Sequence, residues 1–246
     1  MKNYGWQIVL GIVLIALSTV LYYVYFLIYH DAHHIFVYLL EAVAFVPIQV
    51  LLVTLIIEGL LNIREKKSKM AKLNMVIGTF YSDTGTKLAE YFFKFDPDGE
   101  TIRNDLVIDD DWTNEKFSSA INVLRNHKYN LQIEKIDLEG LRCRLLEKRK
   151  FMMRLLENPN LLEHDNFTDM LWAIFHLTEE LVARNQFSGL SKNDIEHLRG
   201  DMKRAYKAII FEWIAYMKHL KAEYPYLFSL AMRTNPFNPN ASVYVP

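Results

Sequence analysis

The sequence predicts an all-α protein in which an N-terminal two-helix transmembrane hairpin is followed by a cytoplasmic helical bundle. Two long apolar runs occupy residues 1–62, whereas nearly all Lys, Arg, Asp and Glu lie in residues 63–246. In the second part apolar residues recur at steps of three and four, and no alternating strand pattern is sustained. Only nine glycines and seven prolines occur among the 246 residues, which favours long helices.

The first apolar run contains no charged residue between Tyr4 and Tyr29. A helix of about 20 apolar residues crosses the hydrocarbon core of a bilayer, and this run is longer. The apolar region of a cleaved signal peptide has only about 7–15 residues and ends at small side chains, whereas this run ends in YYVYFLIYH. We therefore expect a retained span over residues 5–29.

A second apolar run covers residues 35–61, and the connection HDAHH is so short that the two spans must form an antiparallel hairpin. Basic residues follow the second span directly, and the connection has no Lys or Arg. The positive-inside rule therefore predicts that both termini are cytoplasmic, with the hairpin in the inner (plasma) membrane of a prokaryote. The expected partner of this basic segment is the lipid bilayer. A net charge of −1 argues against nucleic acid as a partner. The basic residues are Arg64, Lys66, Lys67, Lys69 and Lys72.

Three polar side chains, Glu41, Gln49 and Glu58, lie within or near the second span. Burying a polar group in the hydrocarbon core costs free energy, so a functional role is the first hypothesis for such a residue. At about 100° per residue, Gln49 lies about 80° from Glu41 on the helix, and Glu58 lies about 100° from Glu41 on the other side. The three side chains do not share one stripe, so each is a candidate for a helix interface or a cavity rather than for a simple pore lining.

Two groups of side chains could bind a divalent metal ion. The connection between the spans offers His30, Asp31, His33 and His34, although an ordinary interfacial turn is the simpler interpretation. In the bundle, a mononuclear site could use His164, His176, Glu180 and His197, although surface or core histidines are the simpler interpretation there. The single cysteine, Cys143, excludes a cysteine-based zinc cluster.

The cytoplasmic part is predicted to hold five or six helices. The second span should continue as a helix to Tyr81, and Ser82–Asp83–Thr84 should end that helix and start another. Asp109, Asp110 and Asp111 are expected to favour the start of the next helix, because acids stabilise the positive end of a helix. Ser191 and Asp194 fit a capping box for the last long helix. Helices are expected over about 114–125, 137–158 and 166–185, the second of them stopped by Pro159.

No motif for phosphate, dinucleotide, serine-nucleophile or zinc-protease chemistry occurs in the chain. We therefore assign no catalytic residue, predict no cofactor beyond a possible divalent metal ion, and assign no specific small molecule as a ligand. An enzyme is accordingly the less favoured interpretation.

Three segments together resemble a family of prokaryotic two-span membrane proteins of uncharacterised function. They are HHIFVYLLEAVAFVPIQVLLVTLIIEGLLN, KLNMVIGTFYSDTGTKLAEYF and YPYLFSLAMRTNPFNPNAS. The resemblance covers the hairpin, the helix that follows it and the C-terminal segment. It implies the same architecture and carries over no activity, cofactor or catalytic residue.

The functional hypothesis is a homo-oligomeric assembly, either channel-like or a sensor that transmits a signal, in which the hairpin is coupled to the cytoplasmic domain. Two exposed spans make self-association plausible on physical grounds. The alternatives are a membrane-tethered metal-dependent enzyme and a non-conducting scaffold.

Overall fold

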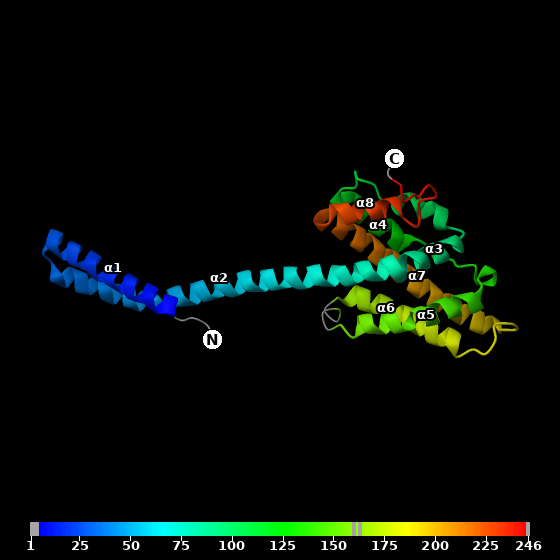
Figure 1. Ribbon diagram of the computed structural model, residues 1–246, viewed down its shortest axis with the longest axis horizontal. Helices are drawn as coiled ribbons and strands as arrows, with labels where there is room; N and C mark the ends of the chain where they lie inside the picture. Colours follow the sequence, from blue (N-terminus) through cyan, green and yellow to red (C-terminus); the bar gives the residue numbers. More distant parts are fainter. Residues whose placement is uncertain (1–4, 159–160, 162–163, 245–246) are drawn as a thin grey trace. The chain divides into compact units, whose positions relative to one another are not determined.

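The computed structural model describes residues 5–158, 161 and 164–244. All regular secondary structure in this part of the chain is helical, which confirms the all-α prediction (Figure 1). The chain divides into two compact units, Met1–Lys66 and Lys67–Pro246, and each is described separately. A few helical residues are described by their backbone alone, namely Gln7, Lys66, Lys67, Lys69, Met70 and Ala71.

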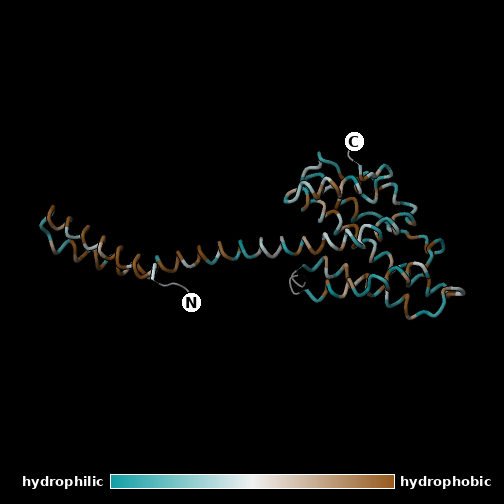
Figure 2. Tube along the Cα trace, in the orientation of Figure 1, coloured by the Kyte–Doolittle hydropathy of each residue, from teal (hydrophilic) through white to brown (hydrophobic). Residues whose placement is uncertain are grey.

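The first unit contains α1 (Gly5–Tyr29) and the first part of α2 (Ala32–Phe80), which run antiparallel (Figure 1). Both helices are long and apolar enough to cross a membrane, over Ile8–Tyr29 and Ala32–Glu65. No described side chain in either stretch is buried, and the brown colour of Figure 2 follows both helices. Their apolar faces are therefore available to an apolar surrounding.

The turn between the two helices is built from local contacts. His30 adopts a positive φ of 52°, and its backbone N–H donates to the carbonyl of Phe26 at 2.9 Å, which closes α1. Asp31 Oδ1 accepts a hydrogen bond from the backbone N–H of His34 at 3.1 Å in the first turn of α2. This contact satisfies one of the N–H groups that a helix start leaves without a partner.

The second unit is a helical domain whose predicted elements near residues 114–125, 137–158 and 166–185 are confirmed within a few residues at their ends. Pro159, the predicted stop, lies outside the described residues. The unit also contains short 3-10 helices at Gly99–Asp105 and Ile133–Lys135. Its longer helices are α3 (Thr86–Lys94), α4 (Asn114–Asn126), α5 (Leu138–Leu156), α6 (Asp165–Val182), α7 (Lys192–Glu223) and α8 (Pro225–Arg233).

The predicted break at Ser82–Asp83–Thr84 is wrong, because these residues belong to a π-helix, η1 (Tyr81–Gly85), that joins α2 to α3 without interruption. The polar side chains bind one another and a neighbouring helix rather than capping a new start. The hydroxyl of Thr84 donates to Asp83 at 2.8 Å, and Asp83 pairs with Lys148 of α5 at 3.2 Å. Side chains engaged in this way leave the backbone free to continue its helical hydrogen bonds.

The start of α4 is also corrected, because its cap is Thr113 and not the preceding aspartates. The side chain of Thr113 accepts from the backbone N–H of Lys116 at 3.3 Å. Asp109 instead accepts from the backbone N–H of Asp111 at 3.1 Å, which forms a local turn. The predicted cap of α7 is confirmed, since the hydroxyl of Ser191 accepts from the backbone N–H of Asp194 at 3.1 Å.

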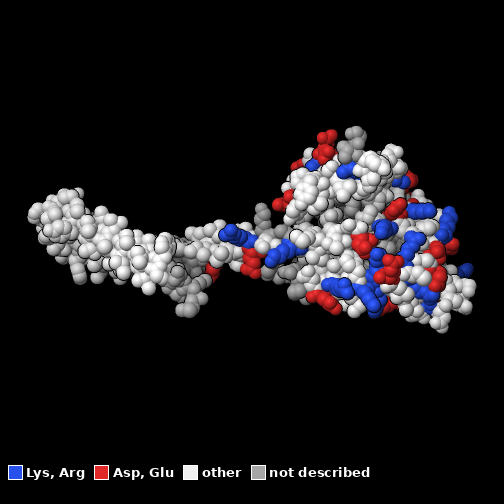
Figure 3. All heavy atoms as spheres, viewed as in Figure 1, with Lys and Arg blue, Asp and Glu red and all other residues white. Residues whose placement is uncertain are grey.

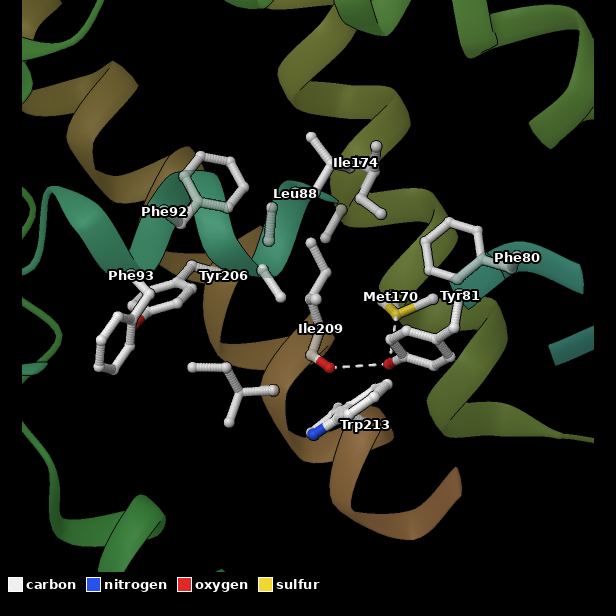
Figure 4. Packing of buried hydrophobic residues seen from close by; sticks show 14 of the residues in the cluster. Phe80, Tyr81, Leu88, Phe92, Phe93, Met170, Ile174, Tyr206, Ile209 and Trp213 are labelled. Carbon is white, nitrogen blue, oxygen red and sulfur yellow. Dashed lines mark hydrogen bonds between the residues drawn. The ribbon is translucent and has the colours of Figure 1, made fainter. Parts of the chain in front are cut away.

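Helix α7 provides the centre of the core and contacts α3, α4, α6 and α8. The hydroxyl of Tyr81 donates to the backbone carbonyl of Ile209 at 2.7 Å, and its ring contacts Trp213 at a centroid distance of 5.3 Å (Figure 4). Phe80 packs edge-on against Phe167 of α6. The end of α2 therefore enters the same core as α6 and α7.

Glu212 on α7 is one of three buried acidic residues in the described part of this domain, with Asp96 and Asp201, and only 3% of the residue is exposed. The Nδ1 atom of His164 accepts from the backbone N–H of Phe167, so its Nε2 atom carries the proton when the ring is neutral. That Nε2 atom lies 3.7 Å from Glu212 Oε1. Burial raises the pKa of Glu212 to about 7 and lowers the pKa of His164.

We expect Glu212→Gln to stabilise the protein increasingly as pH rises from 5 to 8. Because the folded-state pKa of Glu212 is raised from 4.5 to about 7, the stability linked to its bound proton is complete below the unfolded pKa. This stability is lost as pH rises through the folded pKa, by roughly 3 kcal/mol in total. Thermal unfolding of both proteins, followed by circular dichroism in the same detergent, measures the difference. Parallel pH profiles would contradict the raised pKa.

Candidate metal centre

Helices α6 and α7 are consecutive, and each carries a histidine and an acid four residues apart. The pairs are His176 with Glu180 on α6 and His197 with Asp201 on α7. Residues four apart lie on the same face of a helix, so each pair presents its ligands together. The turn between the helices includes Gly189, whose φ of +76° favours glycine. Packing of α6 against α7 then brings the two pairs face to face.

These four residues form the α6–α7 cluster, in which one ligand atom of each residue lies within 4.8 Å of the others. His176 Nε2 lies 3.5 Å from Asp201 Oδ1 and 4.0 Å from Glu180 Oε1. His197 Nε2 lies 3.4 Å from Asp201 Oδ2 and 3.5 Å from Glu180 Oε2. Each imidazole therefore contacts a carboxylate from its own helix and one from the other helix.

The spacing of the cluster fits a single metal ion. Protein ligands lie about 2.1 Å from a divalent zinc ion, so the edge of a tetrahedron of ligands is about 3.4 Å long. The four histidine–carboxylate distances in the α6–α7 cluster run from 3.4 to 4.0 Å. Closing the remaining gap requires only small rotations of side chains, because the helices already hold both pairs at the required separation.

The two carboxylates of the cluster differ in burial and in their hydrogen-bond partners. Asp201 is 2% exposed, its Oδ1 atom accepts from Arg204 at 2.9 Å, and its buried Oδ2 atom has no hydrogen-bond partner in the described structure. Buried carboxylate oxygens normally accept hydrogen bonds, so this atom is available to bind a cation or a protonated histidine. Glu180 accepts from Arg184 at 2.7 Å, and this bond lowers the pKa of Glu180.

The donor set is two imidazoles and two carboxylates, which suits zinc and the late first-row divalent metals better than calcium or magnesium. The two imidazoles are half exposed, with side-chain exposures of 46% for His176 and 53% for His197. A metal ion held there would face solvent on one side and could keep a water molecule in an open position.

The sequence-based hypothesis for the bundle identified three of the four cluster residues and missed Asp201. His164, which that hypothesis included, lies apart from the cluster at the start of α6 beside Glu212. The signal for Asp201 was present, because a His-x-x-x-acid pair occurs on each of two consecutive helices. The match between the two spacings points to Asp201 more directly than any single histidine does.

The other candidate residues lie on the first unit and on the following turns of α2. In the loop, Asp31 binds the backbone of His34, and the ring of His34 contacts Tyr38 at 4.6 Å. The polar residues Glu41, Gln49 and Glu58 have exposed side chains on α2, as do Arg64 and Lys72. Lys66, Lys67 and Lys69 lie on the same helix. Their expected roles stay predictions.

Comparisons with known proteins agree on one family. The chain matches the MJ1433 N-terminal helical domain over residues 2–61, and it matches the C-terminal helical domain of the uncharacterized protein MJ1433 over residues 69–233. It is 43% identical over 245 residues to the uncharacterized protein MJ1433 of Methanocaldococcus jannaschii, covering 100% of this chain and 98% of the relative. No solved structure matches the chain. The chain therefore belongs to the MJ1433 family of helical proteins.

Proposed function

We propose that this protein is a membrane-anchored metal-binding protein whose cytoplasmic helical domain senses a divalent transition metal ion. The observation that carries the proposal is the α6–α7 cluster, in which ligand atoms from four residues lie within 4.8 Å of one another. Exposed acidic clusters are common without a metal ion. This cluster differs because it pairs two imidazoles with a buried carboxylate oxygen, Oδ2 of Asp201, that accepts no hydrogen bond from the described residues.

The apolar hairpin supports the anchoring part of the proposal. Its two helices expose large side chains along their lengths, such as Ile15, Ile28 and Leu40 with 64–70% exposed. Burying such side chains out of water is worth about 1.5–3 kcal/mol each, so a bilayer is a far better surrounding than water. Figure 3 shows charged residues gathered over the second unit and almost none over the hairpin. The basic residues after the second span favour termini in the cytoplasm of a prokaryotic cell.

The sensing part rests on the length of α7. Its first turns carry His197 and Asp201, and further along the same helix the backbone carbonyl of Ile209 accepts from Tyr81 of η1, directly after the end of α2. A metal ion would draw the first turns of α7 towards α6 and favour one arrangement of this helix. That arrangement would be transmitted to the end of α2 through the buried Tyr81 contact.

A metal-dependent enzyme is the second candidate, and one observation favours it. A hollow of about 450 Å³ adjoins the cluster and is lined by His176, Trp172, Asp169 and Arg204 together with two alanines. A bound metal ion could lower the pKa of a coordinated water molecule there and generate a nucleophile. The channel-like assembly and the homo-oligomer expected from the sequence stay predictions.

We expect the full-length protein to bind one Zn²⁺ or Co²⁺ ion per chain with all four cluster residues. His176→Ala, His197→Ala and Asp201→Asn should each weaken binding by about 100-fold or more, since a lost ligand costs at least as much as a lost outer-shell partner. Titration calorimetry and the visible absorption of bound Co²⁺ measure the effect. His33→Ala is the matched control and should bind normally. Equal binding by all variants would overturn the proposal.

Orientation in the membrane is tested with the single native cysteine. Cys143 is exposed in the second unit, so in intact cells a membrane-impermeant maleimide should label it only after lysis. In a variant that combines Cys143→Ser with Ala32→Cys, the new thiol lies beside the short turn and should be labelled from outside without lysis. The reverse labelling pattern would contradict cytoplasmic termini, and labelling of both positions in intact cells would contradict a membrane-spanning hairpin.

Hydrogen exchange distinguishes a sensor from a simple binding site. If the metal ion acts through α7, saturating Zn²⁺ should slow amide exchange at residues 74–85 as well as around the α6–α7 cluster, because both regions share one packed core. Asp201→Asn should abolish both effects. Protection confined to the cluster, in a protein that binds the ion tightly, would contradict the sensor and leave the enzyme as the better candidate.

A further inference from the structure

Helices α6 and α7 pack antiparallel, and a groove follows their line of contact. His164 at the start of α6 lies 3.7 Å from Glu212, whereas His176 farther along α6 lies 3.5 Å from Asp201, which precedes Glu212 on α7. At 1.5 Å per residue, the two contacts are about 17 Å apart along the helices. The line of contact is therefore long enough for an organic molecule as well as for a metal ion.

Two adjoining hollows make up this groove. The first, of about 450 Å³, begins at His176 of the α6–α7 cluster, and the second, of about 540 Å³, extends towards the start of α6 and is flanked by α4. Both are lined by Asp169, Arg204 and Ala208, so the hollows are continuous. On α6 the lining residues Asp169, Trp172 and His176 follow one another at steps of three and four, which places them on one face. All residues of the groove belong to the second unit.

Three cationic side chains line the groove, Arg204 in both hollows and Arg125 and Lys207 in the second. Arg204 donates one hydrogen bond to Asp201 at 2.9 Å, which leaves its other N–H groups available. Arg125 is exposed, and no hydrogen bond or ion pair joins it to any described residue. The ammonium group of Lys207 lies 5.7 Å from the ring centroid of Phe211 and forms no ion pair in the described part of the chain.

The acidic side chains of the groove offset this charge only in part. Asp169 is exposed and lies within ion-pair distance of none of the three cations. Glu212 is buried, which raises its pKa to about 7, so about half of these carboxyl groups carry a proton at neutral pH. Arg204 and Lys207 are three residues apart on one helix, where like charges repel each other. The described lining therefore has a net positive charge that an anion would neutralise.

The kind of anion follows from the cations. An arginine guanidinium group has a planar fork of donors that matches two oxygen atoms of a phosphate. A phosphate monoester carries close to two negative charges at neutral pH, so it suits a site with several cations better than a carboxylate or a sulfate does.

The groove also offers an uncovered aromatic side chain. Trp172 lines the first hollow and is 60% exposed, which is unusual for the largest apolar side chain. Aromatic rings stack on an exposed indole, and this is how proteins hold the bases of single-stranded nucleic acids beside a basic groove. Cations and an aromatic surface in one groove favour a ligand that has both a phosphate group and a flat ring.

We propose that this groove binds a soluble phosphate monoester of an aromatic compound. The phosphate lies among Arg125, Arg204 and Lys207, and the ring packs against Trp172. None of the three cations belongs to the α6–α7 cluster, so binding goes beyond the proposed metal function and does not require the metal ion. A lipid headgroup also carries a phosphate, but it has no ring to cover the exposed indole.

The test uses the full-length protein in phosphatidylcholine nanodiscs with a chelator, so that no metal ion contributes. The probes are naphthyl phosphate, naphthyl sulfate, methoxynaphthalene and inorganic phosphate, and empty nanodiscs correct for partition. Equilibrium dialysis is carried out at about pH 7.5, where the phosphate ester is mostly a dianion. Naphthyl phosphate should bind about tenfold more tightly than the sulfate, which makes fewer charged hydrogen bonds. Equal binding of naphthyl phosphate and methoxynaphthalene would overturn the proposal.

Variants locate the two parts of the ligand. Arg125→Gln and Lys207→Gln should each weaken binding of naphthyl phosphate by about tenfold and leave methoxynaphthalene unchanged. Lys203→Gln, at an exposed position of α7 outside the lining, removes the same charge and should change nothing. Trp172→Ala should weaken naphthyl phosphate by about fivefold, because stacking is lost, and leave inorganic phosphate unchanged. Equal losses in Lys203→Gln and Lys207→Gln would contradict a defined site.

Two further arms separate this proposal from a lipid site and from the metal centre. Nanodiscs that contain phosphatidic acid should bind naphthyl phosphate as well as phosphatidylcholine nanodiscs do. Competition by phosphatidic acid that disappears in Arg125→Gln would assign the groove to a lipid headgroup and overturn the proposal. Arg125→Gln should bind Zn²⁺ normally, so failure of the phosphate site and failure of the metal site are observed independently.

Discussion

The continuous buried face of α7 is the constraint on which the helical domain depends. Packing of α3, α4, α6 and α8 against this one helix places most of the core, including Leu198, Ile209 and Trp213. Because the first turns of α7 also carry His197 and Asp201, the register of that face decides whether the metal ligands meet. A shift of one residue would rotate both ligands by about 100° and separate them from α6.

The metal centre and a pocket at the end of α2 lie on different parts of this core. The α6–α7 cluster lies near the turn between its two helices, where half-exposed imidazoles face solvent. The pocket lies where the end of α2 meets α7 and α8. Polar groups that are buried without partners are costly in a stable core. Asp201 has such an atom, and it lies within the α6–α7 cluster.

Several elements were predictable from local rules, and others were not. The cap of α7 followed from Ser191 and Asp194 alone, because a capping box acts within one turn. Ser82 and Thr84 also looked like a helix boundary, but contacts with α5 and α7 kept the chain helical there. The three aspartates before α4 were misleading for a related reason. A favourable charge near a helix start is weaker than the direct hydrogen bond that Thr113 provides.

The all-α class, the two long apolar helices and most helix positions could be predicted from the sequence, since these depend on periodicity, charge and residues close in the chain. The sequence also brought His176, Glu180 and His197 into consideration as ligands. The packing of distant helices places Asp201 with them, sets His164 beside Glu212 instead, and forms a pocket lined by residues of the π-helix and α8. These outcomes depend on which faces of distant helices pack together, and no local pattern specifies that choice.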